Sequence, residues 1–459
     1  MIEKKLRIHF VGIGGAGMSG LASILLDLGY KISGSDLISS KVTKRLAEKG
    51  ATIFKGHNKN NIEGADLVVI SSAIPQSNPE IKEALEKNIR VIRRAEMLAK
   101  IVEDRYLIAI SGTHGKTTTT SMISLLLEKG GFDPLVLIGG EANNIRGNAK
   151  LGFGKYAVAE ADESDGSFLK LKPFLAVVTN VEDDHLDYYK SLENVSKNFK
   201  TFINSIPDDG SVVLCKDCEN VRRLMLDCRK KYITYGISTD ADIVAKEIKL
   251  DRLSSESQIY WQNKKMGKLR LNVSGYHNIL NALAAFSVAQ ELGMKFTEIA
   301  EILKTYQAVE RRMEIVANLD NKILIMDDYA HHPTEIKVTL NAVRESWKNR
   351  RIIVVFQPHR YTRTKILAKK FGEVFFNADK VIINDIYSAN ELPISGISGE
   401  TIFDEIKKAN HNHIKYIPAK DDTVDYLTKI IRAEDIIITM GAGDVWTIGQ
   451  ELVKRLKNK

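Results

Sequence analysis

The chain has 459 residues, of which 44% are apolar and 27% are charged, and its formal net charge is +8. This length predicts several domains, the short apolar runs exclude a membrane span of roughly 18 residues, and three cysteines argue against a disulfide framework. The positive charge suits anionic small molecules, but lysine and arginine are spread along the chain without the dense basic block that nucleic-acid binding needs.

Residues 1–105 predict a first α/β domain. Residues 8–11 have the pattern of a buried strand, and YKISGSD and ADLVVISSA follow as further strands with helical patterns between them. This alternation is typical of a parallel sheet. The amino end enters its first strand directly after a few charged residues and leaves no room for a signal peptide, so we expect a cytoplasmic protein.

A glycine-rich loop follows the first predicted strand. GIGGAGMSG contains Gly12, Gly14 and Gly17 in the pattern G-x-G-x-x-G, and Asp36 ends the next strand. Taken alone, this pattern indicates a dinucleotide site and a NAD-dependent oxidoreductase. The same backbone amides bind any diphosphate, so a diphosphate-bearing substrate is the alternative, and a separate ATP loop favours it.

Residues 106–312 predict a second domain, which begins with the strand YLIAIS and the loop GTHGKTTTT. Gly112, Gly115, Lys116 and Thr117 form G-x-x-G-K-T, a P-loop shorter than the general pattern. In such a loop the backbone amides and the helix amino end face phosphates, the lysine neutralises phosphate oxygens, and the threonine can ligate magnesium. The loop therefore predicts binding of ATP or GTP, either in an enzyme or in a nucleotide-sensing scaffold without chemistry.

Two acidic clusters follow later strands of this domain. One is AVAEADESDGSF and the other is TNVEDDHLDYY, and their chemistry-bearing residues are Glu160, Asp162, Glu163, Asp165, Asp183, Asp184, His185 and Asp187. Carboxylates at the carboxyl ends of parallel strands lie where an open sheet binds ligands, and phosphoryl transfer needs its cation held from a second side. Each cluster alone is compatible with a solvated acidic loop, but two of them after a P-loop favour a metal site.

Residues 313–459 predict a third α/β domain, with strands KILIMDD, RIIVVFQP, KVIINDI and DIIITMGAG. His331 follows the first of these strands, and Arg360 and Arg363 follow the second. Guanidinium groups pair with planar anions, so the two arginines predict a clamp for a carboxylate or a phosphate. The adjacent His331 and His332 lack a second ligand pair at zinc spacing, and GAGD is interpreted as a structural turn.

Together these stretches resemble the Mur ligase family, the ATP-dependent amide-forming enzymes of peptidoglycan synthesis. GTHGKTTT, EADESD, NVEDDHLD, GYHNILN, ERR, DDYAHHP and QPHRYTR occur in the family's order across almost the whole chain. The resemblance implies the α/β fold class and the three-domain Mur ligase architecture, with a Rossmann-like N-terminal domain, a P-loop central ATPase-like domain and a Rossmann-like C-terminal domain. These would bind the UDP-sugar (1–105), ATP (106–312) and the amino acid (313–459).

Within the family, HFVGIGGAGMSG and QPHRYTR are similar to the member that joins L-alanine to the carboxylate of UDP-N-acetylmuramate through an acyl phosphate. The alternative is the tripeptide-recycling member, which acts on the same UDP-sugar but usually shows EADEYD and EPRSNT where this chain has EADESD and QPHRYT. The implied cofactors are ATP and Mg²⁺. The implied partners are UDP-N-acetylmuramate and L-alanine, bound by a monomer or homodimer that contacts neither nucleic acid nor membrane.

The resemblance also implies site residues. The ATP site comprises Gly112, Thr113, His114, Gly115, Lys116, Thr117, Thr118, Asn278, Asn281, Arg312 and Asp328. The magnesium ligands are Thr117, Glu160 and His185, with Glu163 as the alternative to Glu160, and the catalytic residues are Lys116, Glu160, Glu163 and His185. The UDP-sugar is held by Gly12, Gly14, Gly15, Gly17, Asp36 and Ser71. L-Alanine is held by His331, Arg360 and Arg363.

Overall fold

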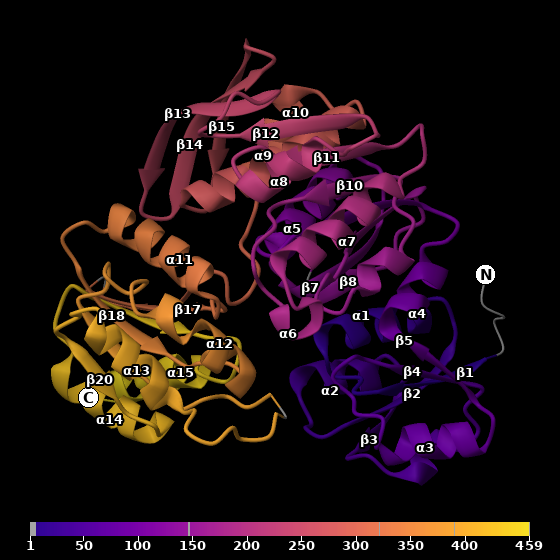
Figure 1. Ribbon diagram of the computed structural model, residues 1–459, viewed down its shortest axis with the longest axis horizontal. Helices are drawn as coiled ribbons and strands as arrows, with labels where there is room; N and C mark the ends of the chain where they lie inside the picture. Colours follow the sequence, from indigo (N-terminus) through magenta and orange to yellow (C-terminus); the bar gives the residue numbers. More distant parts are fainter. Residues whose placement is uncertain (1–5, 146, 321, 390, 459) are drawn as a thin grey trace. The chain divides into compact units, whose positions relative to one another are not determined.

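The computed structural model describes residues 6–145, 147–320, 322–389 and 391–458, and within them it is an α/β protein with sheets of five, ten and six strands (Figure 1). None of the helices in these ranges has both the length and the apolar character needed to cross a membrane. The chain divides into two compact units. The first comprises Met1–Ile248, Glu256–Leu271 and Ile279–Gln307, and the second comprises Lys249–Ser255, Asn272–Asn278 and Ala308–Lys459.

The five-stranded sheet is parallel throughout, and its strand order explains where the glycine loop lies. The order is β3-β2-β1-β4-β5, with β1 (Arg7–Val11), β2 (Lys31–Asp36), β3 (Thr52–Lys55), β4 (Leu67–Ile70) and β5 (Arg90–Arg93). The chain moves outward from β1 to β3 and then returns to the other side of β1 with β4. The loop after β1 therefore lies at the switch point, where open sheets bind ligands.

The ten-stranded sheet has the order β15-β14-β13-β12-β11-β10-β6-β9-β7-β8. Its strands are β6 (Tyr106–Ser111), β7 (Leu135–Ala142), β8 (Gly147–Lys150), β9 (Tyr156–Glu160), β10 (Leu175–Val178), β11 (Ser211–Cys215), β12 (Tyr232–Gly236), β13 (Ile243–Asp251), β14 (Ser254–Trp261) and β15 (Lys264–Leu271). Strand β6 lies between β10 and β9 and pairs with both in parallel. The P-loop and both acidic clusters therefore leave the sheet from three neighbouring strands at one edge.

The six-stranded sheet has the order β16-β17-β21-β18-β19-β20. Its strands are β16 (Glu314–Leu319), β17 (Ile323–Asp328), β18 (Arg351–Phe356), β19 (Lys380–Ile383), β20 (Ile414–Tyr416) and β21 (Asp435–Met440). Strand β16 is antiparallel to β17, and the other pairs are parallel. The carboxyl ends of β17, β21 and β18 consequently meet at one edge, where the predicted amino-acid clamp begins.

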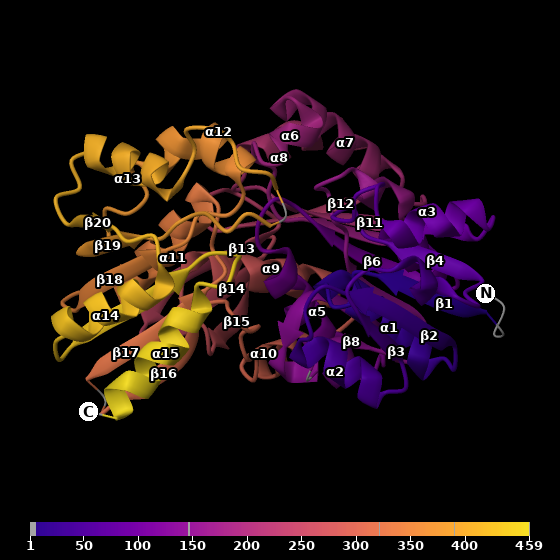
Figure 2. The same ribbon diagram turned by 90° about the horizontal axis from the view of Figure 1, so that it is seen from below.

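Helices cover the sheets through their apolar faces. They are α1 (Ala16–Asp27), α2 (Lys41–Glu48), α3 (Pro79–Glu86), α4 (Arg94–Ile101), α5 (Lys116–Lys129), α6 (Leu186–Tyr189), α7 (Leu192–Asn204), α8 (Glu219–Met225), α9 (Tyr276–Glu291), α10 (Phe296–Leu303), α11 (Pro333–Ser346), α12 (Tyr361–Phe371), α13 (Gly399–Lys408), α14 (Lys420–Ile430) and α15 (Trp446–Lys457). In the second unit, α11, α12 and α13 bury their apolar residues on one face of the six-stranded sheet, and α14 and α15 cover the other (Figure 2).

One hydrophobic core is shared by the five-stranded sheet and the start of the ten-stranded sheet. Helix α1 packs against β7 and β8, so it belongs to both layers (Figure 1). A Cβ atom at Gly20 in α1 would lie only 3.1 Å from Cδ2 of Leu137 in β7, so glycine allows this close packing. The predicted boundary near residue 105 thus lies inside the first compact unit, and the division into three domains stays a prediction.

Several strands were not predicted, and each has a local reason. Strands β3 (TIFK) and β5 (RVIR) are short and carry charged, exposed residues at their ends, so they lack an apolar run. In β13 and β15, exposed charged residues interrupt the apolar run, which weakens the strand signal. Strand β11 (SVVLC) is fully buried, but a short apolar run does not by itself distinguish a strand from a helix.

Candidate active site

The P-loop connects β6 to α5, and its glycines are required by both conformation and space. Gly112 and Gly115 have φ angles of +134° and +82°, which side-chain-bearing residues rarely adopt. A Cβ atom at Gly115 would lie 2.6 Å from Oδ1 of Asn281, and one at Gly112 would collide with the hydroxyl of Thr179. Both conformation and space therefore require glycine at positions 112 and 115.

Residues at the end of β10 hold the P-loop in place. The amide of Thr113 donates to the carbonyl of Asn180 (3.1 Å), and the amide of His114 donates to Oδ1 of Asn180 (2.8 Å). In return, the Thr179 hydroxyl (2.6 Å) and the Asn180 side-chain amide (3.0 Å) donate to the carbonyl of His114. These four hydrogen bonds fix the loop against the strand that carries the second acidic cluster.

Lys116, the first residue of α5, folds back over the loop. Its ammonium donates to the carbonyls of Gly112 (2.5 Å) and Thr113 (3.2 Å) and to Oε1 of Glu163 (2.8 Å). Burial alone would lower the pKa of Lys116, but the charge and hydrogen bond of Glu163 outweigh it and raise the pKa. The lysine is consequently cationic at neutral pH and is positioned at the mouth of the loop.

Glu163 joins the two acidic clusters to the lysine. Its side chain is 2% exposed, and Oε1 lies 2.8 Å from the Lys116 ammonium and 3.6 Å from Nε2 of His185. Its other oxygen, Oε2, is buried and has no hydrogen-bond partner among the residues that the structure describes. Burial opposes protonation of His185, but Glu163 and the charge of Asp184 raise its pKa above the ordinary value. A buried, incompletely satisfied carboxylate beside an ammonium and an imidazole is typical of a ligand site.

The remaining metal candidates lie around this group. Glu160, at the end of β9, accepts a hydrogen bond from the amide of Gly139 at 2.6 Å, and its charge contributes to the raised pKa of Lys116. Thr117 is half-buried in the first turn of α5. The structure thus brings Lys116, Glu163 and His185 into direct contact, with Glu160 within electrostatic reach.

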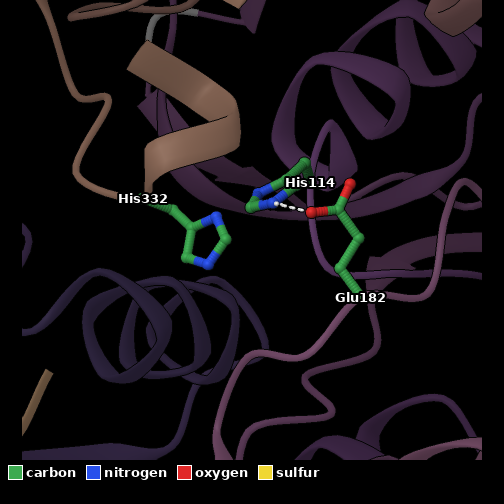
Figure 3. A group of neighbouring side chains, drawn as sticks. All are labelled: His114, Glu182 and His332. Carbon is green, nitrogen blue, oxygen red and sulfur yellow. Dashed lines mark ion pairs between the residues drawn. The ribbon is translucent and has the colours of Figure 1, made fainter. Parts of the chain in front are cut away.

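His114 is held from a different side. Its Nε2 lies 3.5 Å from a carboxylate oxygen of Glu182, as Figure 3 shows. The backbone amide of Glu182 donates to the hydroxyl of Thr113 at 2.9 Å. Glu182 is therefore linked to two neighbouring loop residues, to Thr113 through its backbone amide and to His114 through its carboxylate.

Of the two predicted adenine contacts, Asn281 touches the P-loop directly. Asn281 on α9 accepts a hydrogen bond from the hydroxyl of Thr119 (3.2 Å) and limits the space beside Gly115. Asn278, one turn earlier, donates to the carbonyl of Ser274 at 2.8 Å. Both side chains are buried. Thr118 is likewise buried in the first turn of α5.

The glycine loop of the five-stranded sheet is also shaped by close contacts. Gly12 has a φ of +80°, and its amide donates to the carbonyl of Ser35 at 2.8 Å. The amide of Gly14 donates to Oδ2 of Asp36 at 2.9 Å, so a carboxylate at the end of β2 fixes the turn.

The other predicted sugar-nucleotide residues surround this turn. Gly15 is the N-cap of α1, and Gly17 lies in the first turn of that helix. Ser71 directly follows β4 on the opposite side of the switch point. The amino end of α1 therefore lies at the same end of the sheet as the glycine loop and the end of β4.

In the second unit, Asp328 ends β17 and is buried. Its oxygens accept hydrogen bonds from the amides of Ala330 (2.7 Å) and Met313 (2.8 Å). Burial raises the pKa of Asp328 to about 6, although Arg312 and these amides favour the ionised form. Arg312 stacks on the ring of Tyr329, 5.2 Å from the centroid.

The predicted amino-acid clamp is assembled around His359. The ring of His331 packs edge-on against that of His359 (5.7 Å between centroids), and Nη1 of Arg363 donates to Nδ1 of His359 (3.2 Å). Arg360 precedes α12 with a φ of +69°, and its Nε lies 3.7 Å from Glu391. Burial, together with the neighbouring cationic and imidazole groups, lowers the pKa of His359 to about 2, so this ring stays neutral.

Three models of known protein families match three successive segments of the chain. The family models that match are "Mur ligase family, catalytic domain" over residues 7–106, "Mur ligase middle domain" over 110–289, and "Mur ligase, glutamate ligase domain" over 311–443. The chain belongs to the Mur ligase family. As a Mur ligase it is an ATP-dependent ligase, and its P-loop lies at the start of the matched middle domain.

Relatives in the Mur ligase family align over the full length. A UDP-N-acetylmuramate–L-alanine ligase of Geotalea daltonii is 48% identical over 457 residues, covering 100% of this chain and 99% of the relative. The crystal structure of a UDP-N-acetylmuramate–alanine ligase from Thermotoga maritima has a TM-score of 0.85 at 28% identity, with 99% of each chain covered. A murein peptide ligase from Psychrobacter arcticus has a TM-score of 0.75 at 26% identity, again with 99% of each chain covered.

Several residues of these sites were not predicted. Thr179 and Asn180 anchor the P-loop, although only the residues after them were singled out. Arg311 donates to Asp327 (2.8 Å) and to the carbonyls of Gly441 (2.6 Å) and Gly443 (3.1 Å), so it ties the GAGD turn to β17. Its position next to Arg312 in the ERR stretch is the signal that points to it.

Proposed function

We propose that this Mur ligase joins L-alanine to the carboxylate of UDP-N-acetylmuramate with ATP, in the synthesis of peptidoglycan precursors. The observation that carries the proposal is the 48% identity, over the whole chain, with a relative of that name. The stretches around the P-loop, the acidic clusters and the arginine pair all lie inside the aligned region. We also propose that the reaction takes place in the cytoplasm.

The proposed reaction has two chemical steps. A carboxylate oxygen of the sugar attacks the γ-phosphorus of ATP, the bond to the β–γ bridging oxygen breaks, and ADP leaves behind an acyl phosphate. The neutral amine of L-alanine then attacks the acyl carbon. The tetrahedral intermediate expels phosphate, the nitrogen loses a proton, and an amide remains.

In the first unit, we assign ATP to the P-loop of residues 112–118. The loop amides and the amino end of α5 face the triphosphate, and the Lys116 ammonium stabilises charge on the transferred group. Release of Lys116 from Glu163 would free the ammonium for phosphate oxygens. Asn278 and Asn281 are assigned to adenine.

Magnesium fits the residues of this site. Glu163 offers a buried carboxylate oxygen without a partner, and carboxylate and hydroxyl oxygens are ligands that Mg²⁺ prefers. We assign the cation to Thr117, Glu160 and His185, with Glu163 as the alternative to Glu160. When bound, Mg²⁺ neutralises charge on the phosphate oxygens.

In the second unit, we assign Asp328 to the ribose of ATP and Arg312 to its phosphates. His331, Arg360 and Arg363 are assigned to L-alanine. The guanidinium groups pair with its carboxylate, which leaves the amine directed at the acyl phosphate. A neutral His359 supports this arrangement, because it accepts the hydrogen bond of Arg363 without adding charge.

The UDP-sugar is assigned to the glycine loop, with Gly12, Gly14, Gly15 and Gly17 facing the diphosphate and Asp36 and Ser71 at its borders. On this assignment residues 1–105, 106–312 and 313–459 are the UDP-sugar, ATP and amino-acid domains. The match of three domain models to nearly the same segments supports this division.

The test is product formation from defined substrates. Purified protein with ATP, Mg²⁺, UDP-N-acetylmuramate and L-alanine should release ADP and phosphate only when all components are present. Equal ATP consumption without L-alanine would contradict the second step.

Competition separates the related activities. L-Alanine and the tripeptide, offered together, should yield the alanyl product, whereas tripeptide product would assign the recycling activity of the murein peptide ligases. The fluorescence of NADH should not change when NADH is titrated with the protein. A NADH titration that saturates would instead support a dinucleotide at the glycine loop.

A further inference from the structure

Arg94, the first residue of α4, lies between the glycine loop and the acidic loop of the first unit. Its Nη2 donates to Oδ2 of Asp162 at 2.8 Å, and the arginine side chain is 24% exposed. On its other side the arginine packs onto the backbone of Gly17. A Cβ atom at Gly17 would lie 2.8 Å from Nη1 and 2.9 Å from Cδ of Arg94.

On the acidic side, Arg94 fixes the loop that carries Glu163. Asp162 uses one oxygen for Arg94 and the other for the amide of Ser164, at 3.0 Å. The next residue, Glu163, pairs with the Lys116 ammonium at 2.8 Å. A continuous chain of contacts therefore runs from α4 through the acidic loop to the P-loop.

On the glycine side, the guanidinium covers the first turn of α1. Gly17 is in that turn, next to the amino end of the helix, where an anion would bind favourably. A larger residue at position 17 would displace Arg94, and displacement of Arg94 would release Asp162. Arg94 consequently contacts both loops with one side chain.

We propose that Arg94 is a positioning residue for the ligation. This inference rests on the proposed function, in which the glycine loop binds the UDP-sugar and the P-loop binds ATP. The sugar carboxylate must reach the γ-phosphate, and reaction rates are steeply sensitive to sub-ångström errors in such an approach. Arg94 sets this approach by coupling the loop that holds one substrate to the loop that borders the other.

The chain provides a matched control for the competing explanation, which is simple docking of the two sheets. Arg45 of α2 donates to both oxygens of Glu141 in β7, at 2.9 and 2.6 Å. This ion pair also links the segment before residue 105 to the segment after it. Neither Arg45 nor Glu141 is assigned to a substrate.

The experiment compares steady-state kinetics of the full-length wild type, Arg94→Met and Arg45→Met, with each substrate varied in turn. Arg94→Met should lower kcat/KM for UDP-N-acetylmuramate by about 10- to 100-fold, as expected for loss of a hydrogen bond between charged groups. KM for L-alanine should stay within about twofold, and Arg45→Met should change all constants by less than about threefold. Equal losses in the two variants would overturn the role of Arg94.

A double-variant cycle tests the route through Asp162. If Arg94 acts through this carboxylate, Arg94→Met combined with Asp162→Asn should be no more than about twofold worse than the poorer single variant. If the loss of kcat/KM in the double variant equals the product of the two single-variant losses, the proposed route through Asp162 is overturned.

Arg94→Lys carries the test if Arg94→Met does not fold. A lysine keeps the charge but not the planar pair of nitrogens, so KM for the UDP-sugar should rise by at least about threefold, and an unchanged KM would overturn the proposal. A wild type that makes no alanyl product would overturn the proposed function as well. An active wild type with equivalent variants would overturn only the role of Arg94.

Discussion

Replacing Gly115 by alanine should disable the P-loop, whereas the same replacement at Gly131 should not. The two glycines flank the same helix, α5, and have nearly the same backbone conformation, with φ of +82° and +78°. They differ in their surroundings. A Cβ atom at Gly115 would lie 2.6 Å from Oδ1 of Asn281, whereas one at Gly131 would have no described residue other than its chain neighbours within 4 Å.

The difference in surroundings separates two free-energy costs of the alanine substitution, one from backbone conformation and one from contact with Asn281. Alanine in the left-handed region costs about 1–2 kcal/mol at either position. At position 115, Asn281 must also withdraw by about 0.8 Å to reach an ordinary 3.4 Å contact, which breaks its hydrogen bond to the buried Thr119 hydroxyl. An unsatisfied buried hydroxyl adds about 1–3 kcal/mol, so Gly115→Ala should be the less stable variant by that amount.

The activity difference should be larger than the stability difference. A displacement approaching 1 Å in a catalytic loop can lower a rate by about 100-fold, and we expect that loss in kcat/KM for ATP in Gly115→Ala. Gly131→Ala should keep wild-type kinetics. In denaturant unfolding its free energy of unfolding should fall only by the cost of alanine in the left-handed region, about 1–2 kcal/mol. The reasoning is refuted if both variants lose activity equally, or if Gly115→Ala turns over ATP like the wild type.

Three further predictions concern other parts of the chain. Arg360→Ala should raise KM for L-alanine at least about 10-fold more than KM for ATP, because it removes a clamp on one substrate's carboxylate. Lys365→Ala, a change at an exposed position of α12, should alter neither KM. Equal effects of Arg360→Ala on both substrates would count against the clamp. Arg311→Met should lower the free energy of unfolding by about 3 kcal/mol, since it leaves the buried carboxylate of Asp327 without its ion-pair partner. Arg455→Met removes an exposed ion pair and should lower the free energy of unfolding by less than about 1 kcal/mol. Similar denaturation midpoints for the two variants would contradict this difference. Burial opposes ionisation of Glu80, but His9, Ser35 and Asn61 lower its pKa from 4.5 to about 2, so Glu80→Gln should cost about 3 kcal/mol near neutral pH. The wild type's advantage over Glu80→Gln should be complete above pH 4.5 and disappear as the pH falls towards about 2; a stability difference that does not depend on pH in this window would show that the charge is not responsible.

Much of the α/β architecture was predictable because its signals are local. The strand YLIAIS is a run of apolar residues that ends in a glycine loop, and the structure forms β6 over Tyr106–Ser111. The α9 pattern, rich in alanine and leucine, becomes the helix Tyr276–Glu291. Mixed strands such as β13 and β15 were not predicted, because their exposed lysines interrupt the apolar run and only pairing within the sheet makes them strands.

The candidate site was predicted in part for the same reason. Gly112, Gly115 and Lys116 are recognisable because a phosphate loop needs these residue types at short, fixed spacing. Asn180 was not recognisable as an anchor, since it is 66 residues away from His114 along the chain and its role exists only when β10 pairs with β6. Glu163 was predicted as a catalytic residue but, for magnesium, only as the alternative to Glu160, and it is the carboxylate that contacts both Lys116 and His185.

The sequence by itself determined which residue types are available at each strand end: glycines that permit close approach to phosphate, a lysine, carboxylates and a pair of arginines. Only the tertiary structure decided which of them meet. Strand order places β6 between β10 and β9, which brings Lys116 and Glu163 together, and the packing of α4 places Arg94 between Gly17 and Asp162. The physical reason is that hydrogen bonds and ion pairs act over a few ångströms, whereas the residues that form them are brought into range by sheet order and burial rather than by their spacing in the chain.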